Sequence, residues 1–501
     1  MNRSIKRSFF RHFGRRMATG VALLVIAASP AASVVDSWVR VATGGLGDDT
    51  RKVHDLVIHD GYLWVATADL ATSGGKHPRL FRALLRADSR WEEVTLPWRA
   101  DSDGEISDLQ PFGGDLYVAS TFGQLWRYAH AGAWTRLTPW TGSTAILAVG
   151  VWELVPGTPT VCAFRAPAQI SCGLETRTAT PLPPVPLHNA AGVAAAQLLS
   201  FGDRLFLSVT GGSAGSRACE VHSFSDRWTA VTTDCFGNPD RPWAGDMTVF
   251  GERLYLGTGG HTRNAVYEVT DAGTYSEVAG AFAGLDMNRI PASAVAVHQL
   301  FMGSHVAGLV DTYAAVERTV DGSTWHQSNE PGFGVDADDV TSALAGEGTR
   351  LYAGVLNVGD GFEIWRRNFL LFETLREDSP AYRALLSEGF RQLLCLRAGV
   401  TGCPARVQLT ALFGRVRLGF DTANHPADDA KLILALRKQL ATADTELTRA
   451  LALADQADKV APLDRHKAAL LYKEAARHLE LSLRITQTTW EAAQAAVANK
   501  G

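Results

Sequence analysis

The chain has 501 residues, of which 46% are hydrophobic and 20% charged, with 47 glycines and 20 prolines. This apolar content is enough to bury a large core and excludes a disordered chain, and the length fits several domains or one long repeat fold. Lysine and arginine total 48 against 52 aspartates and glutamates, which excludes a basic protein that coats nucleic acid.

The N-terminus has the three parts of a secretory signal. Its first sixteen residues carry six basic side chains and no acid, then come the apolar run Met17–Ala28 and the small residues SPAAS. We predict that residues 1–33 are a signal peptide cleaved after Ser33, and that the mature chain is periplasmic or secreted. The alternative is an uncleaved anchor, but the run is shorter than the roughly 20 residues that span a bilayer. No later segment is apolar enough to span, so no membrane span is expected after signal removal.

The charge of the remaining chain is uneven. Residues 34–369 contain 24 basic and 37 acidic residues, and residues 370–501 contain 18 basic and 15 acidic residues. An acidic body argues against nucleic acid or anionic lipid as its partner.

The six cysteines form three local couples. In an exported protein an even number of cysteines indicates disulfides, and short loops close most easily. We therefore predict nearest-neighbour pairs, Cys162–Cys172, Cys219–Cys235 and Cys395–Cys403. Zinc binding is the alternative, but no couple has C-x-x-C spacing and no histidine pair falls near one.

A strand of one type recurs about every 45 to 50 residues, which indicates a repeat architecture. A turn containing glycine or aspartate precedes most copies, an apolar strand stands before the turn, and a third strand and an aromatic-marked fourth strand follow. The copies of the central strand begin at Leu63, Leu116, Leu205, Leu254, Leu300 and Leu351, and residues 160–174 fill the long interval between the second and third as a degenerate copy.

Four short antiparallel strands per unit predict a β-propeller of seven blades over residues 34–369. The last unit lacks a fourth strand, and residues 37–41 supply one, so an N-terminal strand is expected to close the ring. The predicted fold class is therefore mainly β with a C-terminal α region: a seven-bladed β-propeller closed by an N-terminal strand, followed by a helical hairpin.

The repeats carry a family resemblance. The segments LYVAS and QLWRY in the second unit, with GFG, LYAG and EIWR in the last, resemble the repeats of secreted bacterial β-propeller proteins of the Kelch-like and sialidase-like kind. Residues 319–325 are similar to the sialidase Asp-box turn but one residue short. The resemblance covers about residues 35–367 and implies a scaffold that carries many unrelated functions.

The sequence after Arg367 changes from a period of two to helical spacing. We predict a helical linker region over 370–425, with a helix capped by Ser379-Pro380, and an antiparallel hairpin over 426–501. Heptad seams predict its coiled-coil helices at about 427–458 and 465–497. The hairpin either packs on itself or on the propeller, with Trp490 as the anchor, or is an arm for a partner or for self-association.

No catalytic motif is present, and the fourteen histidines show no ligand spacing. The loops that lead into the innermost strands are acidic, and in a propeller such loops gather on one face. Converging carboxylates bind Ca²⁺ or a cationic ligand or supply an acid/base pair, although aspartate is also a common turn residue. No cofactor is expected, and Ca²⁺ is the only candidate ion. The predicted ligand-binding residues are Asp49, Arg51, Asp103, Glu105, Asp246, Asp286, Arg289 and Asp338.

These observations favour an exported binding protein that recognises a protein or glycan through the propeller face. The alternative is a secreted carbohydrate-active hydrolase or lyase with carboxylates at the channel mouth. A third interpretation is a structural role in an envelope assembly.

Overall fold

The computed structural model describes residues 37–498, apart from short segments. The predicted signal at 1–33 therefore lies outside the described residues. Also outside are 48–50, 70–77, 86–89, 99–104, 131, 138–143, 177–178, 189, 212–218, 239–242, 261–263, 283–284, 286, 308–311, 336–337, 358–359, 370, 400, 402–405 and 421–426.

The part up to residue 368 is built from short strands. The first half contains β1 (Ser37–Ala42), β2 (Arg51–His59), β3 (Tyr62–Asp69), β4 (Arg79–Leu84), β5 (Glu92–Val94), β6 (Ile106–Phe112), β7 (Asp115–Ser120), β8 (Leu125–Tyr128), β9 (Trp134–Arg136), β10 (Ile146–Val155), β11 (Thr158–Arg165), β12 (Gln169–Cys172) and β13 (Thr180–Pro181). The second half contains β14 (Val193–Phe201), β15 (Arg204–Gly211), β16 (Glu220–Phe224), β17 (Trp228–Thr232), β18 (Trp243–Phe250), β19 (Arg253–Gly259), β20 (Val266–Val269), β21 (Tyr275–Glu277), β22 (Met287–Ala296), β23 (Gln299–Ala307), β24 (Thr312–Thr319), β25 (Trp325–Gln327), β26 (Asp338–Glu347), β27 (Arg350–Asn357) and β28 (Gly361–Asn368).

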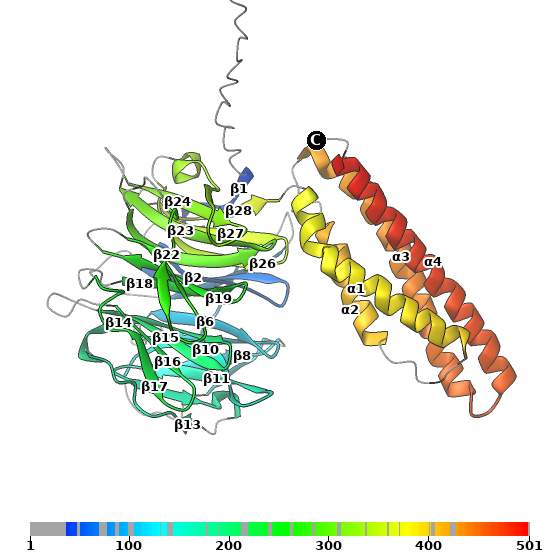
Figure 1. Ribbon diagram of the computed structural model, residues 1–501, viewed down its shortest axis with the longest axis horizontal. Coiled ribbons are helices and arrows are strands. Elements are labelled where there is room, and N and C mark those ends of the chain that lie inside the picture. Colours follow the sequence, from blue (N-terminus) through cyan, green and yellow to red (C-terminus); the bar gives the residue numbers. More distant parts are fainter. Residues whose placement is uncertain are drawn as a thin grey trace, which may run out of the picture. The chain divides into compact units, whose positions relative to one another are not determined.

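The strands form antiparallel meanders that follow the chain (Figure 1). Each meander starts with a first strand and continues outward through its hairpins, as in β2-β3-β4-β5. The meanders β18–β21 and β22–β25 are joined into one sheet by a bridge between Gly259 and Arg289. The sheet β26-β27-β28 is extended by β1, with Ser37 opposite Asn368 and Arg40 opposite Trp365.

The first strands contact one another in the order β2, β6, β10, β14, β18, β22, β26, and β26 contacts β2 again. Consecutive antiparallel meanders whose first strands follow one another in this way make a β-propeller. The propeller expected from the repeats is therefore confirmed as the fold of this part of the chain.

Local sequence explains the hairpins. Between β2 and β3, Asp60 and Gly61 have φ of 51° and 76°. Two central residues with positive φ make the turn whose twist matches that of a two-stranded ribbon, and aspartate-glycine is a preferred pair for it. The apolar clusters lie between neighbouring meanders: one joins Trp64 and Leu80 to Leu109 and Leu116.

Two of the three predicted disulfides are present, Cys162–Cys172 and Cys219–Cys235. Cys162 and Cys172 are opposite each other in the β11–β12 ladder, as expected for a bond between neighbouring strands. Cys395 is also disulfide-bonded, and its predicted partner Cys403 lies outside the described residues.

The C-terminal part is helical, with α1 (Leu371–Arg397), α2 (Arg406–Gly419), α3 (Ala427–Val460) and α4 (Arg465–Ala498). α3 and α4 contact each other along their length, close to the two predicted helices (Figure 1). The buried seam includes Leu436, Leu440 and Ala443. No helix among the described residues is long and apolar enough to cross a membrane.

The expected helix start at Ser379-Pro380 is wrong. α1 begins at Leu371 and runs through both residues. A proline inside a helix removes one backbone hydrogen bond, a cost that packing further along the helix offsets. Here α1 buries Leu385 and Leu393 in a core shared with the other helices.

Candidate functional site

The structure describes the predicted ligand residues unevenly. Asp49, Asp103 and Asp286 lie outside the described residues, and of Arg51 only the backbone, at the start of β2, is described. The other predicted residues all lie at or near the start of a first strand: Glu105 before β6, Asp246 in β18, Arg289 in β22 and Asp338 in β26. Of these four, Glu105 lies in a loop that leads into a first strand, whereas Asp246, Arg289 and Asp338 lie within the strands themselves.

Three recessed carboxylates act on one another electrostatically across the first strands. Asp55 of β2 and Asp108 of β6 are neighbours whose protonation is linked, and the charge of Asp55 also acts on Asp246 of β18. Asp55 and Asp108 occupy equivalent places, opposite Ala66 and Ala119 and directly after a β-bulge. The bulge adds a residue to the first strand and redirects the side chain that follows it.

These side chains link one meander to the next. Asp55 Oδ2 accepts the backbone N–H of Leu109 at 2.7 Å, and Asp108 Oδ2 accepts that of Val149 at 2.5 Å. The Ser293 hydroxyl donates to the Asp246 backbone carbonyl oxygen at 3.4 Å, and the backbone N–H of Ser293 lowers the pKa of the Asp246 carboxyl. In each case the acceptor belongs to one first strand and the donor to the following one.

Glutamine takes the same role in the meander that begins with β14. Gln197 Oε1 accepts the backbone N–H of Met247 on β18. An uncharged side chain therefore performs the same linking, which identifies hydrogen-bond acceptance, rather than negative charge, as the common requirement.

Burial raises the pKa of all three carboxyls. It raises the pKa of Asp246 to about 7, with the charge of Asp55 adding to the effect, and it also raises the pKa of Asp55. Burial, followed by the charge of the neighbouring Asp55, raises the pKa of Asp108 well above its usual range.

A second acidic pair lies below the surface where β26 begins. Asp338 is fully buried and accepts the side-chain N–H of Asn357 at 3.1 Å, and burial followed by the charge of Glu363 raises its pKa to about 7. Glu363 is buried and ion-paired at 2.8 Å with Arg40 of β1, 323 residues away in the chain. This pair ties β1 to the last sheet.

Arg289 has a different environment. Its guanidinium lies over the exposed ring of Trp243, 5.5 Å from the ring centroid. Its Nε is buried and has no hydrogen-bond partner among the described residues, and burial lowers the pKa of Arg289. Opposite it in the ladder is His305, whose Nε2 is likewise buried and without a partner in the described part of the chain.

Sequence reasoning singled out Asp246 and Arg289 and did not single out Asp55, Asp108, Trp243 or His305. Asp55 lies in a run that looks like an ordinary strand, and nothing local shows that it meets Asp108. The signal that existed was the recurrence of an aspartate between a polar residue and a leucine, in His54-Asp55-Leu56 and Ser107-Asp108-Leu109.

Metal binding finds no support in the described residues. Among them, no three histidine, cysteine, aspartate or glutamate side chains form a group that could hold a metal ion. The recessed carboxylates instead accept backbone N–H groups.

No family model matches the chain, and no curated protein matches it either. Among solved structures, β-propeller proteins resemble it at low identity. A chain of the mitotic checkpoint complex is 13% identical, with 70% of this chain and 99% of that chain covered and a TM-score of 0.45. YCF48 bound to D1 peptide is 12% identical, with coverages of 68% and 99% and a TM-score of 0.43. The endosialidase of phage phi92 is 9% identical, with coverages of 66% and 68% and a TM-score of 0.41.

Proposed function

We propose that residues 34–501 form an exported binding protein. In this proposal a seven-bladed propeller over residues 34–369, closed by β1, recognises a protein or glycan through the face at which its first strands begin. The cyclic order of the first strands, the pairing of β1 with β28 and the Arg40–Glu363 ion pair support the closed ring. Disulfides are expected in an oxidising compartment, which supports export.

The observation that carries the proposal is that the recessed acidic residues hydrogen-bond to the backbone of the neighbouring first strand. Paired catalytic carboxyls of glycoside hydrolases stand roughly 5–9.5 Å apart, with the substrate or water between them. Asp55 and Asp108 are instead recessed, and each accepts a backbone N–H from the next first strand. Such a pair holds blades together, which favours recognition over hydrolysis.

The face where the first strands begin carries polar groups without partners in the described structure. Arg289 and His305 each have a buried nitrogen with no hydrogen-bond partner among the described residues, and Trp243 exposes 43% of its surface beside them. Exposed aromatic rings and arginines are the residues most often found at the centres of binding sites.

The helical part has a role separate from this face in our proposal. Its core is made of residues from α1, α2, α3 and α4, and Trp490 stacks on Tyr382 of α1 at 4.4 Å. We keep the division into 370–425 and 426–501 and propose that this part is an association arm. The exposed Phe390 and Leu394, one turn apart on α1, support an arm that meets a partner or a second copy.

The test uses the purified mature chain on glycan and protein panels, with two variants. Trp243→Ala alters the propeller face, and Leu394→Glu alters the helical surface. We expect at least one ligand whose binding is abolished by Trp243→Ala and unchanged by Leu394→Glu. Absence of any ligand, or loss with the second variant alone, would overturn recognition by the propeller.

A further inference from the structure

One row of cross-strand partners runs over two meanders at the end where β18 and β22 begin. Trp243 of β18 is opposite Gly259 of β19, Gly259 is opposite Arg289 of β22, and Arg289 is opposite His305 of β23. Residues directly opposite each other in an antiparallel sheet point to the same face. The indole, the guanidinium and the imidazole therefore project side by side.

Gly259 is the residue that lets this row form. A Cβ at this position would lie 2.6 Å from the Cβ of Arg289 and 3.1 Å from that of Trp243. Because glycine has no Cβ, the two side chains close over it, and the guanidinium lies on the indole ring. The guanidinium and the indole are thus packed together over Gly259.

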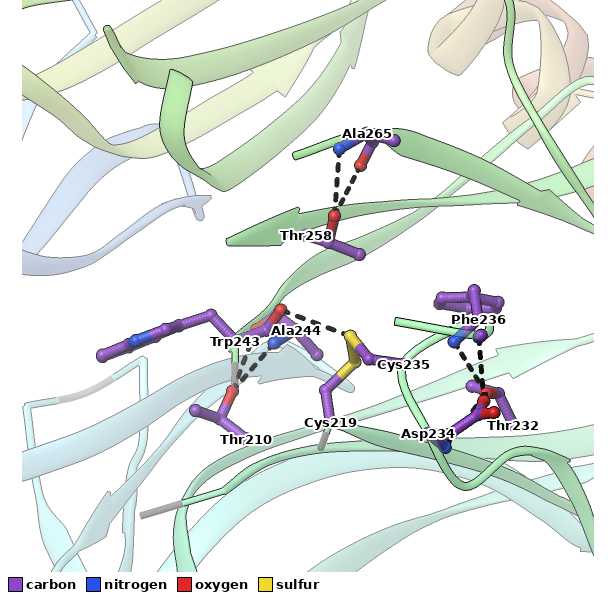
Figure 2. The surroundings of a disulfide bond; sticks show 11 residues. Thr210, Cys219, Thr232, Asp234, Cys235, Phe236, Trp243, Ala244, Thr258 and Ala265 are labelled. Carbon is purple, nitrogen blue, oxygen red and sulfur yellow. Dashed lines mark hydrogen bonds between the residues drawn. A yellow bond between two sulfur atoms is a disulfide. The ribbon is translucent and has the colours of Figure 1, made fainter. Parts of the chain in front are cut away.

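The backbone at Trp243 and Ala244 is held by contacts with Thr210 and Cys235. The Thr210 hydroxyl is 3.1 Å from both the backbone nitrogen and the carbonyl oxygen of Ala244, and Cys235 Sγ lies 3.9 Å from the carbonyl oxygen of Trp243 (Figure 2). In Figure 2 the indole extends away from the Cys219–Cys235 disulfide. The backbone is held on one side, and the ring is presented on the other.

The positive charge of Arg289 has no counter-charge among the described residues. Arg289 has no hydrogen-bond or ion-pair partner among the described residues, and only burial shifts its pKa. A partly buried cation without a counter-charge is unfavourable, and an anion placed against it restores the balance. Burial followed by the charge of Arg289 lowers the pKa of His305, so its imidazole is neutral at pH 7 and able to donate one hydrogen bond.

The remaining neighbour is an acid. Asp339 of β26 acts on His305 and accepts the Thr312 hydroxyl at 2.9 Å, but it is not among the groups that act on Arg289. A carboxylate at the edge of the site repels a polyacidic peptide and accepts hydroxyl groups. One guanidinium balances one negative charge, and the exposed indole offers a flat apolar surface.

We propose that Trp243, Arg289 and His305 bind the carboxylate-bearing ring of an acidic sugar, a uronate unit of a glycan. The carboxylate takes the unpaired guanidinium, the imidazole and Asp339 take ring hydroxyls, and the indole supports the ring. This inference rests on the proposed function and names its ligand class.

The test is calorimetric titration of the mature chain with oligosaccharides of galacturonate, glucuronate and mannuronate. The fully methyl-esterified galacturonate oligomer is the uncharged control ligand. We expect at least one acidic oligomer to bind and its ester to bind at least tenfold more weakly. Arg289→Gln and Trp243→Ala should each weaken binding by at least tenfold. Arg253→Gln is the matched control, because Arg253 lies on β19, is ion-paired with Glu268 and is exposed. It should leave binding unchanged.

The test uses both Arg289→Gln and Trp243→Ala, so that one variant still reports on binding if the other destabilises the fold. Trp243 is exposed, so its replacement should leave the melting temperature of the chain unchanged even if that of Arg289 does not. Equal binding of acid and ester, binding unaffected by both variants, or absence of binding to every uronate oligomer overturns the inference. Binding of acidic peptides, but not sugars, through Arg289 also overturns it.

These outcomes separate the inference from the proposed function. A neutral glycan or a protein that binds independently of Arg289 overturns the uronate site and leaves recognition by the propeller standing. A chain that binds nothing on either panel overturns both.

Discussion

Replacing Asp246 by asparagine isolates the ionisation of one recessed carboxyl. Asparagine has nearly the shape of aspartate and keeps a carbonyl oxygen, but it carries no charge at any pH. The hydrogen bond from the Ser293 hydroxyl of β22 to the backbone carbonyl of residue 246 in β18 is independent of this side chain, so only the pH-dependent component of the stability is removed. That component is large because burial raises the pKa of Asp246 to about 7.

The sign follows from proton binding. An aspartate in the unfolded chain releases its proton near pH 3.8, whereas the folded state holds it up to about pH 7. Between these values the folded state binds more protons, so the free energy of unfolding decreases as the pH rises. One pKa unit corresponds to about 1.4 kcal/mol. Between pH 5 and pH 8 the ionisation of Asp246 alone would lower the free energy of unfolding by about 2–3 kcal/mol. Because the side chain is partly solvent-exposed, we expect a smaller decrease of about 1–2 kcal/mol.

The assay is urea denaturation of the wild type and of Asp246→Asn at pH 5, 6, 7 and 8 under non-reducing conditions. We expect the free energy of unfolding to decrease by about 1–2 kcal/mol more in the wild type than in the variant between pH 5 and pH 8. Asp226→Asn is the control: a hydrogen bond from Ser225 lowers the pKa of that exposed carboxyl, so it does not titrate in this range. Equal pH dependence of wild type and Asp246→Asn would refute the reasoning.

Three further results are expected. Replacing Cys219 and Cys235 together by serine should lower the unfolding free energy by about 3 kcal/mol, since the bond closes a loop of 16 residues; an unchanged urea midpoint would contradict this. Arg40→Ala should cost about 1–3 kcal/mol, because it leaves buried Glu363 without its counter-charge, and unaltered thermal unfolding would count against closure by β1. Trp490→Ala should cost about 3–5 kcal/mol in the helical part, followed by circular dichroism at 222 nm, and no change there would show that the indole fills no pocket.

The sequence predicted the features that depend on neighbouring residues. The strand motifs beginning at Leu116 and Leu254 lie within β7 and β19, and two disulfides join the cysteines nearest in the chain. Heptad spacing placed the α3 and α4 helices within a few residues of their ends. Each of these patterns is complete within about 50 residues.

The parts that could not be predicted depend on register and on contacts between strands far apart in the chain. Asp55 and Asp108 meet because two bulged strands lie side by side, and neither bulge has a reliable sequence signature. Trp243 and Arg289 are 46 positions apart and become neighbours through one bridge at Gly259. The expectation for Trp490 left its partner open, because only the packed helices show that it stacks on Tyr382.

The most direct test of recognition by the propeller face is hydrogen–deuterium exchange of the mature chain with and without a bound acidic oligosaccharide. We expect the ligand to slow exchange at the starts of β18, β22 and β26 and to leave the outer strands β9, β17 and β25 unchanged. Protection confined to the outer strands or to α1–α4 would contradict recognition by this face.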